Sequence, residues 1–281
     1  MKTITRSNIV VILGFLLAWS PADGFNLSSK FSNVSDKLSI TDTIVDKVGD
    51  LMYAIKLKSC NLCKTTEELK FVETVWAKLV KVAPQCDFYK AAKAKNWQWK
   101  VSVVDDRATA DAEAFPGGKV LVYSGICAIT GNDQAKMAYV LSHEMAHALA
   151  RHAKSRFDKQ TKKALISAAS AGTLNAAGLD PKVTLGAMSA IGVAYGKAVV
   201  VPFSKDQEIE ADHIALMIMA QAGFDPEASL KFLEKQNNLL NKNTLKIKRS
   251  SQDDHPPIEK RAANLKQHFP EAMKIYQKNR G

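Results

Sequence analysis

Cysteine is scarce in this chain of 281 residues, which contains only Cys60, Cys63, Cys86 and Cys127. The first two form a close pair, and the lack of a second pair argues against a structural zinc site built from four cysteines. No cysteine precedes residue 60, which excludes a lipid on an N-terminal cysteine of an exported form. In an exported protein we favour a structural disulfide, and a bridge from Cys86 to one member of the pair is one option, since the sequence does not determine the connectivity. Cys127 lies in an apolar segment and is expected to be a buried free thiol.

Long apolar runs are also lacking. The run from Ile9 to Trp19 is too short for a comfortable membrane span. Lys2 and Arg6 precede it and Ser20-Pro21-Ala22 follows it, an arrangement typical of a secretory signal peptide. We therefore expect residues 1–22 to be removed on export to the periplasm or cell envelope. The alternative is an uncleaved N-terminal membrane anchor.

A second stretch, residues 164–202, is rich in Ala, Gly, Val and Ser but is interrupted by Pro181, Lys182 and Lys197. These interruptions argue against a transmembrane helix. Closely packed helices of small residues are the first interpretation, and a flap over the functional site or against a membrane is the second.

Acidic residues are outnumbered by basic ones. The net charge of +11 falls to +9 when Lys2 and Arg6 leave with residues 1–22, which hold no acidic residue. Such an excess favours peripheral contact with anionic membrane surfaces. The lysines are scattered, and no recognition motif or interleaving of aromatic and basic residues accompanies them. Nucleic acid is therefore not expected as a partner.

Hydrophobic periodicity predicts a mostly α-helical α+β fold with one small sheet. The expected helices cover residues 40–57, 67–82, 134–151, 205–222, a segment after Asp225-Pro226, and two closing helices over 258–268 and 270–278. The expected strands cover residues 97–104, 112–115 and 119–123, with Pro116-Gly117-Gly118 as a turn. The predicted organisation is a signal peptide (1–22), an N-terminal leader and helical segment (23–90) and a catalytic domain (91–281).

The segment His143-Glu144-Met145-Ala146-His147 has the residue types and spacing of a zinc-hydrolase helix. Residues four apart lie on one helix face, so His143 and His147 can bind the same metal ion. Glu144 lies about 100° around the helix from His143, where it can act as base on a water at the metal. Asp133 is a plausible N-cap for this helix.

A catalytic zinc usually has three protein ligands and one open position. Glu208 and Asp212 are four residues apart on another expected helix. Glu208 is the best candidate for the third ligand, and Asp212 could accept a hydrogen bond that orients a ligand imidazole. Glu210 points to a different face and is expected to be a solvated charge. By residue type alone, an acidic helix start is also explained by the helix dipole.

The remaining histidines are weaker candidates. His152 follows the motif helix and is expected at the surface, and His213 and His268 are expected to be structural or exposed. His255 precedes Pro256-Pro257 in a predicted rigid turn, which makes it the stronger functional candidate among them.

Four motifs in this order resemble the HtpX, CAAX-prenyl-protease and Oma-type family of zinc metallopeptidases, and its periplasmic BepA- and LoiP-like branch in particular. The matching stretches lie between Pro116 and Ala272. They are Pro116-Gly117-Gly118-Lys119-Val120 with Tyr123-Ser124-Gly125, His143 to His152, Glu208-Ile209-Glu210-Ala211-Asp212, and His255-Pro256-Pro257 with Arg261.

This resemblance implies a gluzincin-type peptidase domain that binds one Zn²⁺ per chain. The implied ligands are His143, His147 and Glu208, with Glu144 as base and Asp212 as the partner of a ligand. His255 and Arg261 would lie near the metal, where they could stabilise the oxyanion or fill the open position. An edge strand facing the cleft would pair with an extended substrate, and it would consist of Gly117, Gly118, Lys119, Val120 and the residues up to Tyr123.

Two departures from the family pattern affect substrate preference rather than metal binding. Asp111-Ala112-Glu113 stands where the family often has Asn-Ala-aromatic, and Asp253-Asp254 replaces a small polar pair before His-Pro.

The expected function is a zinc endopeptidase acting on unfolded or misfolded exported proteins. A non-enzymatic chaperone or assembly factor with a rarely open metal site is the alternative. A redox protein using Cys60 and Cys63 is a third reading, although no βαβ context surrounds that pair.

Overall fold

The computed structural model describes residues 42–64, 66–156, 158–159, 203–241 and 256–280. All helices and strands below belong to one compact unit formed by residues 40–156 and 201–281. The expected signal peptide, the stretch 164–202 and His255 lie outside the described residues. No helix within the described ranges combines the length and the apolar character needed to cross a membrane.

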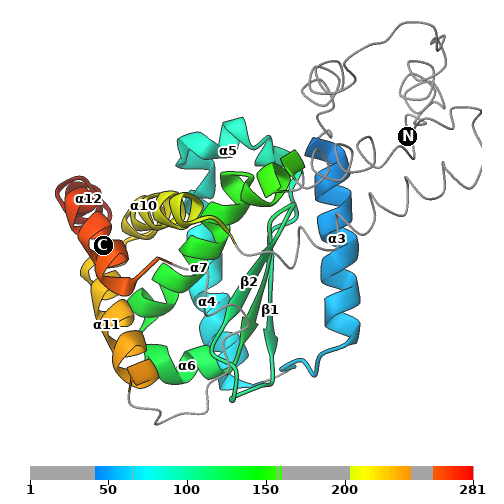
Figure 1. Ribbon diagram of the computed structural model, residues 1–281, viewed down its shortest axis with the longest axis horizontal. Helices are drawn as coiled ribbons and strands as arrows, with labels where there is room; N and C mark the ends of the chain where they lie inside the picture. The colour runs from blue at the N-terminus through cyan, green and yellow to red at the C-terminus, as the bar shows by residue number, and fades with distance from the viewer. Residues whose placement is uncertain (1–41, 65, 157, 160–202, 242–255, 281) are drawn as a thin grey trace, which may run out of the picture. The chain divides into compact units, whose positions relative to one another are not determined.

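A three-stranded sheet forms the centre of the unit (Figure 1). Its strands are β1 (Lys100–Val104), β2 (Ala112–Phe115) and β3 (Lys119–Tyr123), in the order β1-β3-β2. The bounds of β2 and β3 confirm the prediction, whereas β1 begins three residues later than expected. The two tryptophans before it, Trp97 and Trp99, instead pack edge to face with ring centroids 5.3 Å apart.

The central position of β3 corrects one prediction. The strand within Gly117–Tyr123 is not an edge strand, because β3 pairs in parallel with β1 on one side and antiparallel with β2 on the other. Gly117 and Gly118 both have a φ of +83°, a backbone conformation that suits glycine, and this tight turn folds β2 back onto β3. The edge strand on that side of the sheet is therefore β2.

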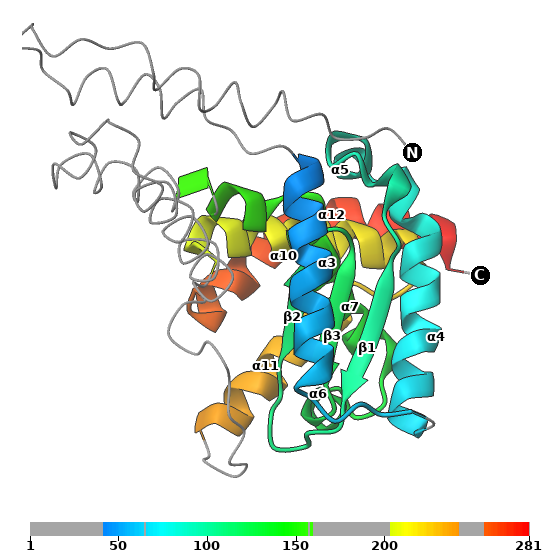
Figure 2. The ribbon, with the colours of Figure 1, turned by 90° about the vertical axis from the view of Figure 1, so that its right-hand side faces the viewer.

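Helices cover both faces of the sheet. Helix α3 (Asp42–Lys58) lies across one face (Figure 2), where Tyr53 packs against Phe115 of β2. Helices α4 (Glu67–Val82) and α7 (Gln134–Leu149) cover the other face. Alternation along β3 explains this, since Leu121 and Tyr123 point towards α3 while Val120 and Val122 join the larger core.

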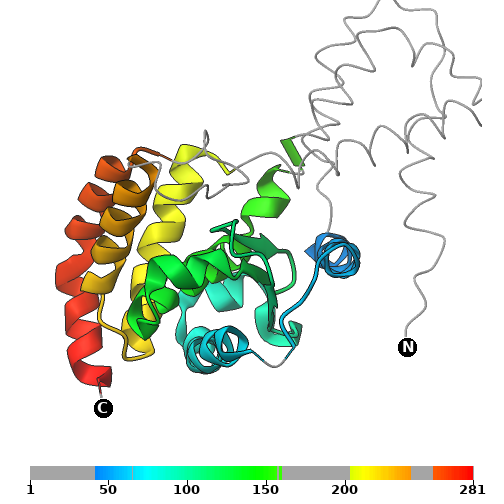
Figure 3. The ribbon, with the colours of Figure 1, turned by 90° about the horizontal axis from the view of Figure 1, so that it is seen from below.

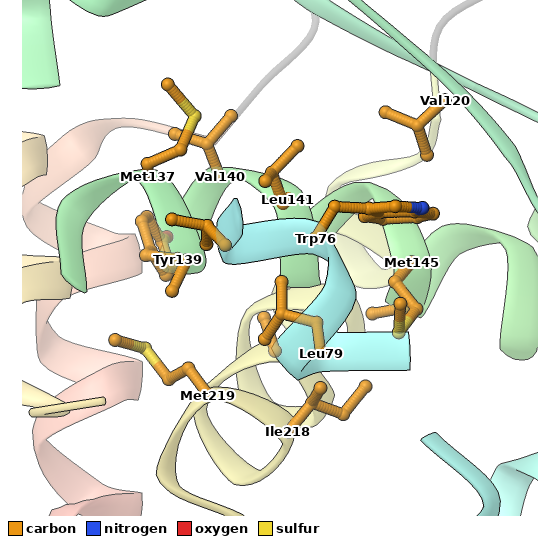
Figure 4. Close-up of a cluster of buried hydrophobic side chains, with 14 of the residues drawn as sticks. Trp76, Leu79, Val120, Met137, Tyr139, Val140, Leu141, Met145, Ile218 and Met219 are labelled. Atoms are coloured by element: carbon orange, nitrogen blue, oxygen red, sulfur yellow. The ribbon is translucent and has the colours of Figure 1, made fainter. Parts of the chain in front are cut away.

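Three further long helices complete the unit. Helix α10 (Lys205–Gln221) packs on α7, and α12 (Ile258–Asn279) packs on α10 and on α11 (Glu227–Asn241), as Figure 3 shows. Short helices connect these elements: η1 (Ala83–Gln85), α5 (Asp87–Ala91), η2 (Ala94–Asn96) and α6 (Gly125–Thr130). Helices α7 and α10 share one core with α4, and Leu79 of α4, Leu141 of α7 and Met219 of α10 all belong to it (Figure 4).

Helix α12 corrects a second prediction, because residues 258–279 form one helix rather than two. Pro270 lies inside it. An interior proline removes one backbone hydrogen bond and costs about 3 kcal/mol. Leu265 before it and Ala272 after it are both fully buried. Burial on both sides of Pro270 offsets its cost and keeps the helix continuous.

Both ends of α7 are held by specific contacts. Asp133 is the N-cap, as expected, and its carboxylate accepts hydrogen bonds from the N–H groups of Ala135 and Lys136. The helix ends at Leu149, two residues before the predicted end, and Arg151 follows with a left-handed φ of 55°. Its guanidinium donates to Asp46 of α3, which ties the end of α7 to the opposite layer.

All four cysteines are free thiols, so the favoured disulfide, for which a bridge to Cys86 was one option, is not present. The 16-residue helix α4 explains this, since Cys63 precedes it and Cys86 follows it. At 1.5 Å per residue the helix separates its ends by about 24 Å, whereas a disulfide requires Cα atoms within about 7 Å. Cys127 is buried as expected, and burial raises the pKa of its thiol to about 11.

The close approach of Gly125 to the loop before β2 generates a testable prediction. A Cβ at position 125 would overlap the carbonyl of Thr109 and lie 2.9 Å from that of Arg107. We expect Gly125→Ala to lower the free energy of unfolding by about 1–3 kcal/mol in urea titrations, because the loop must shift. Ala128→Ser, at an exposed position of the same helix, is the control and should change it by less than about 0.5 kcal/mol. Equal stability of both variants would contradict the packing described here.

Candidate metal centre

Three side chains able to bind a metal converge between α7 and α10. His143 and His147 stand one turn apart on α7, and Glu208 stands one turn inside the start of α10. The Nε2 atoms of the two histidines are 3.1 Å apart. Carboxylate oxygens of Glu208 lie 3.3 Å from Nε2 of His143 and 3.4 Å from Nε2 of His147. Together they form a possible metal site.

The spacing of these atoms fits a zinc ion. Zinc bonds to histidine nitrogen and carboxylate oxygen are about 2.0–2.2 Å long, so neighbouring ligand atoms of a tetrahedral site lie about 3.3–3.5 Å apart. The separations between 3.1 and 3.4 Å are close to that edge length. Two imidazoles and one carboxylate are also a known ligand set of catalytic zinc with one open position. The sequence assignment of the three ligands is therefore geometrically consistent.

A second group of three side chains does not fit a metal as well. His213, His268 and Glu271 also come close together, but they are partly or fully exposed. The two imidazoles are stacked, with ring centroids 3.7 Å apart and an angle of 14° between the planes. Lone pairs of ring nitrogens lie in the ring planes, so those of stacked rings run parallel and do not converge on one ion.

Asp212 orients the first histidine, in the position that the sequence predicted. Its Oδ1 lies 3.0 Å from Nδ1 of His143, on the opposite side of the ring from the metal-facing Nε2. The same oxygen accepts hydrogen bonds from the Tyr139 hydroxyl at 2.7 Å and from Nη2 of Arg261 at 2.6 Å. Nε of Arg261 donates to the other oxygen at 2.8 Å. The carboxylate is thus held in one orientation by partners on α7 and α12.

These contacts set the charges at the centre. Burial alone would raise the pKa of Asp212, but the Arg261 guanidinium and His143 outweigh it and hold that pKa well below its usual range. Burial would lower the pKa of His143, whereas Asp212 and Glu208 raise it to about 9 in the metal-free protein. The carboxylates of Asp212 and Glu208 thus favour a positive charge at His143.

The second histidine is oriented by residues that sequence reasoning missed. Nδ1 of His147 lies 2.8 Å from Nδ1 of His152, and Nε2 of His152 lies 3.2 Å from Oε2 of Glu210. His152 was expected at the surface, yet it is buried, because the chain turns sharply at Arg151 and brings His152 back beneath α7. Glu210 is exposed, as expected for a solvated charge, but its carboxylate is also the partner of His152. Neither a lone histidine after a helix nor an acidic helix turn signals this arrangement.

Glu144 faces a pocket next to the ligands. The pocket is lined by Ala110, Asp111 and Ala112 at the start of β2, by Ile126, by Tyr139, Val140, His143 and Glu144 of α7, by Phe232 and Gln236 of α11, and by Arg261. Burial raises the pKa of Glu144 to about 8, with His143 opposing the shift and Asp111 adding to it. The Oε1 atom of Gln236 has no hydrogen-bond partner among the described residues. A carboxyl group whose pKa is raised by burial thus lies beside the possible metal site.

The predicted substrate-binding segment lies elsewhere. Its residues Gly117 and Gly118 form the turn near α3 and Trp99, and Lys119 forms an ion pair with Asp50. Val120 is buried in the core. The hydroxyl of Tyr123 donates to Glu113 at 2.7 Å, on the α3 side of the sheet. None of the five predicted residues, Gly117, Gly118, Lys119, Val120 and Tyr123, lines the pocket, which instead borders β2.

The helix with two histidines and a glutamate, the third ligand from a second helix and the carboxylate behind a ligand define the class of protein, a gluzincin-type metallopeptidase. Comparison with family models agrees, since the model described as Peptidase family M48 matches residues 77–268. This is more than half of the chain, and the protein belongs to peptidase family M48.

Curated relatives carry protease names. The chain is 30% identical over 212 residues to the mitochondrial metalloendopeptidase OMA1 of Saccharomyces cerevisiae, covering 74% of this chain and 58% of that protein. It is 31% identical over 126 residues to the beta-barrel assembly-enhancing protease of Escherichia coli, covering 44% of this chain and 26% of that protein. The chain thus matches about half, or less, of the length of these relatives.

The buried pair of Asp212 and Arg261 generates a prediction on stability. Asp212→Ala leaves the guanidinium without its partner, which typically costs about 3–5 kcal/mol in the free energy of unfolding. Asp206→Ala, at an exposed position of the same helix, is the matched control and should change it by about 0.5 kcal/mol or less.

The pH dependence of the free energy of unfolding of the metal-free protein provides a second measurement on the same pair. Because the pKa of Asp212 is lower in the folded protein, its contribution is present above the unfolded pKa of about 4 and is lost as the pH falls further. This part of the acid destabilisation should be missing in Asp212→Ala, and an identical acid profile would contradict the assigned ion pair.

Proposed function

We propose that this protein is a zinc-dependent endopeptidase that hydrolyses peptide bonds in unfolded or misfolded exported proteins. The main support is the convergence of His143, His147 and Glu208, with Glu144 in the adjoining pocket. The two imidazole Nε2 atoms are 3.1 Å apart, and each lies 3.3–3.4 Å from one of the two Glu208 carboxylate oxygens. When bound, zinc would supply the Lewis acidity that makes water nucleophilic near neutral pH and polarises the scissile carbonyl.

Glu144 acts as the general base. It follows His143 directly in α7, so its carboxylate lies beside the metal position without joining the ligand set. It takes the proton of the attacking water and returns it to the leaving amine. A base works best when its pKa is close to the working pH, and burial shifts Glu144 in that direction.

Arg261 and His255 are two further catalytic groups, and different observations support each of them. Nε and Nη2 of Arg261 contact Asp212, and Nη2 also lies 3.1 Å from the Tyr139 hydroxyl. These contacts support a role in holding Asp212, and through it His143. Because Arg261 also lines the pocket, it can add positive charge near the oxyanion. The same oxyanion role is proposed for His255 from its motif alone.

Strand β2 is the surface for an extended substrate. The N–H of Tyr123 donates to the carbonyl of Asp111 at 3.0 Å, so the main-chain N–H and C=O groups of residues 111, 113 and 115 point towards β3. By the alternation of an antiparallel ladder, Ala112 and Ala114 point their main-chain groups to the outer edge. The N–H of Ala112 is already bonded to the Asp111 carboxylate at 2.9 Å. The N–H of Ala114 and the two outward carbonyls are the groups offered to a substrate.

Main-chain pairing explains why unfolded proteins are the proposed substrates. Only an extended segment can add to the edge of β2, and the hydrogen bonds do not depend on its side chains. Gln236 supplies a further acceptor in the pocket. The apolar N-terminus supports export to the periplasm or cell envelope, and the excess of positive charge supports peripheral contact with an anionic membrane.

A chaperone or assembly factor without catalysis is the second candidate. It is favoured by the same edge strand, which could hold an unfolded chain without cleaving it. Cleavage of an unfolded protein by the purified, zinc-loaded chain, stopped by a chelator, distinguishes the two functions.

Two matched substitutions distinguish the role of a general base from that of a metal ligand. Glu144→Gln should keep zinc bound and lower kcat by about 10²–10⁴-fold, because only the proton acceptor is lost. Glu208→Gln makes the same chemical change at a ligand and should also lower the zinc content. Metal analysis and cleavage of an unfolded protein are measured on both variants, and full activity of Glu144→Gln would rule out its role as base.

A proline at the outer edge of β2 tests substrate pairing. Ala114→Pro removes an N–H that points away from β3, so the sheet should persist while kcat/KM for an unfolded substrate falls about tenfold or more. Ala114→Ser keeps that N–H and serves as the control, with activity close to the wild type. If the proline variant cleaves at the wild-type rate, the substrate does not pair with β2.

A further inference from the structure

We propose that His152 and Glu210 are positioning residues that fix the ring of His147 for zinc, as the far members of a chain from Glu210 through His152 to His147. The proposal rests on the zinc site of the proposed function and adds two residues that act through a ligand. Nothing in the ligand motif itself requires them.

The geometry forms a continuous line of short contacts. Oε2 of Glu210 lies 3.2 Å from Nε2 of His152, and Nδ1 of His152 lies 2.8 Å from Nδ1 of His147. Nε2 of His147 then faces Nε2 of His143 and the Glu208 carboxylate. His152 is 2% exposed, so water does not readily replace either of its contacts.

Counting hydrogens assigns every donor in this line. A histidine that binds zinc through Nε2 carries its hydrogen on Nδ1, so His147 must donate to Nδ1 of His152. His152 must then accept at Nδ1 and carry its own hydrogen on Nε2. A carboxylate accepts that hydrogen, and Glu210 stands at the required atom. The opposite direction would place a hydrogen on Nε2 of His147, which excludes binding to zinc there.

Surrounding residues hold this arrangement. The ring of Phe203 stacks on His147 with centroids 3.7 Å apart and 13° between the planes, which restricts rotation of the imidazole. Nε2 of Gln207 approaches the carbonyl of His152 at 3.4 Å. Gln207 and Glu210 are three apart on α10 and share a face, so one helix holds His152 from two sides.

The two zinc ligands on α7 are therefore oriented in different ways. His143 donates directly to the buried carboxylate of Asp212, whereas His147 reaches a carboxylate through a second imidazole. Helix α10 provides both carboxylates and also Glu208. Carboxylates in such positions make a ligand imidazole a stronger base and fix its tautomer.

Zinc affinity of the purified full chain, measured by competition with a chromogenic chelator, tests the proposal. We expect His152→Leu to weaken zinc binding by about 10–100-fold, because His147 loses its acceptor. His152→Asn places an amide oxygen where Nδ1 stood and should recover most of the affinity. If His152 had only a structural role, both variants would weaken zinc binding to the same extent. His268→Leu, a histidine of α12 outside this line, is the matched control and should bind zinc as the wild type does.

Glu210→Ala gives an independent measurement that does not depend on a buried substitution. The Glu210 side chain is 48% exposed, so the fold should tolerate its loss. Zinc affinity should fall by about tenfold, at the lower end of the same range. The visible spectrum of the cobalt-substituted protein should change in Glu210→Ala and in His152→Leu, because the ligand field at His147 changes.

Unchanged zinc affinity and an unchanged cobalt spectrum in folded Glu210→Ala and His152→Leu would overturn the proposal. Equal losses in His152→Leu and His152→Asn would overturn it as well. The outcome is separable from the proposed function. A wild type that binds zinc but cleaves nothing refutes the peptidase activity and leaves the positioning measurement valid.

Discussion

The buried ion pair of Asp212 and Arg261 is the interaction on which the metal centre depends. It joins α10 to α12, and through Tyr139 and His143 it also reaches α7. A buried charge without its partner is costly, so the three helices are held in the arrangement that satisfies both charges. Glu208 stands one turn before Asp212, and His147 stands one turn after His143. The same arrangement therefore brings the three ligands together.

The sheet adds the second half of the site. Helix α7 packs against β2 on one face of the sheet, so the start of β2 borders the pocket that Glu144 faces. A possible metal site and the edge strand β2 are thus fixed relative to each other by one core. The apolar contacts between α4, α7 and α10 give that core its rigidity, since Leu79, Leu141 and Met219 are fully buried.

Local patterns were enough to predict most elements and the helix that carries the two histidines. The bounds of α4, β2 and β3 follow from periodicity alone, and Asp133 caps α7 as its residue type indicates. Contacts between distant segments were not predictable in this way. The strand order β1-β3-β2 places β2 at the edge of the sheet, where β3 was expected. Burial of Leu265 and Ala272 keeps α12 continuous across Pro270. Local propensity predicts neither effect, because both depend on contacts between segments that are distant along the chain.

The sequence by itself determined that two histidines and a glutamate stand on one helix, and that a second helix carries carboxylates four residues apart, because helical spacing depends only on neighbours along the chain. The tertiary structure alone decided which strand edge borders the pocket and which groups stand behind each ligand. His152 illustrates the difference. Its residue type and place after a helix indicate a surface cation, and only the turn at Arg151 and the packing of α10 bury it between His147 and Glu210. A hydrogen-bond partner depends on distance in space, which spacing along the chain does not specify.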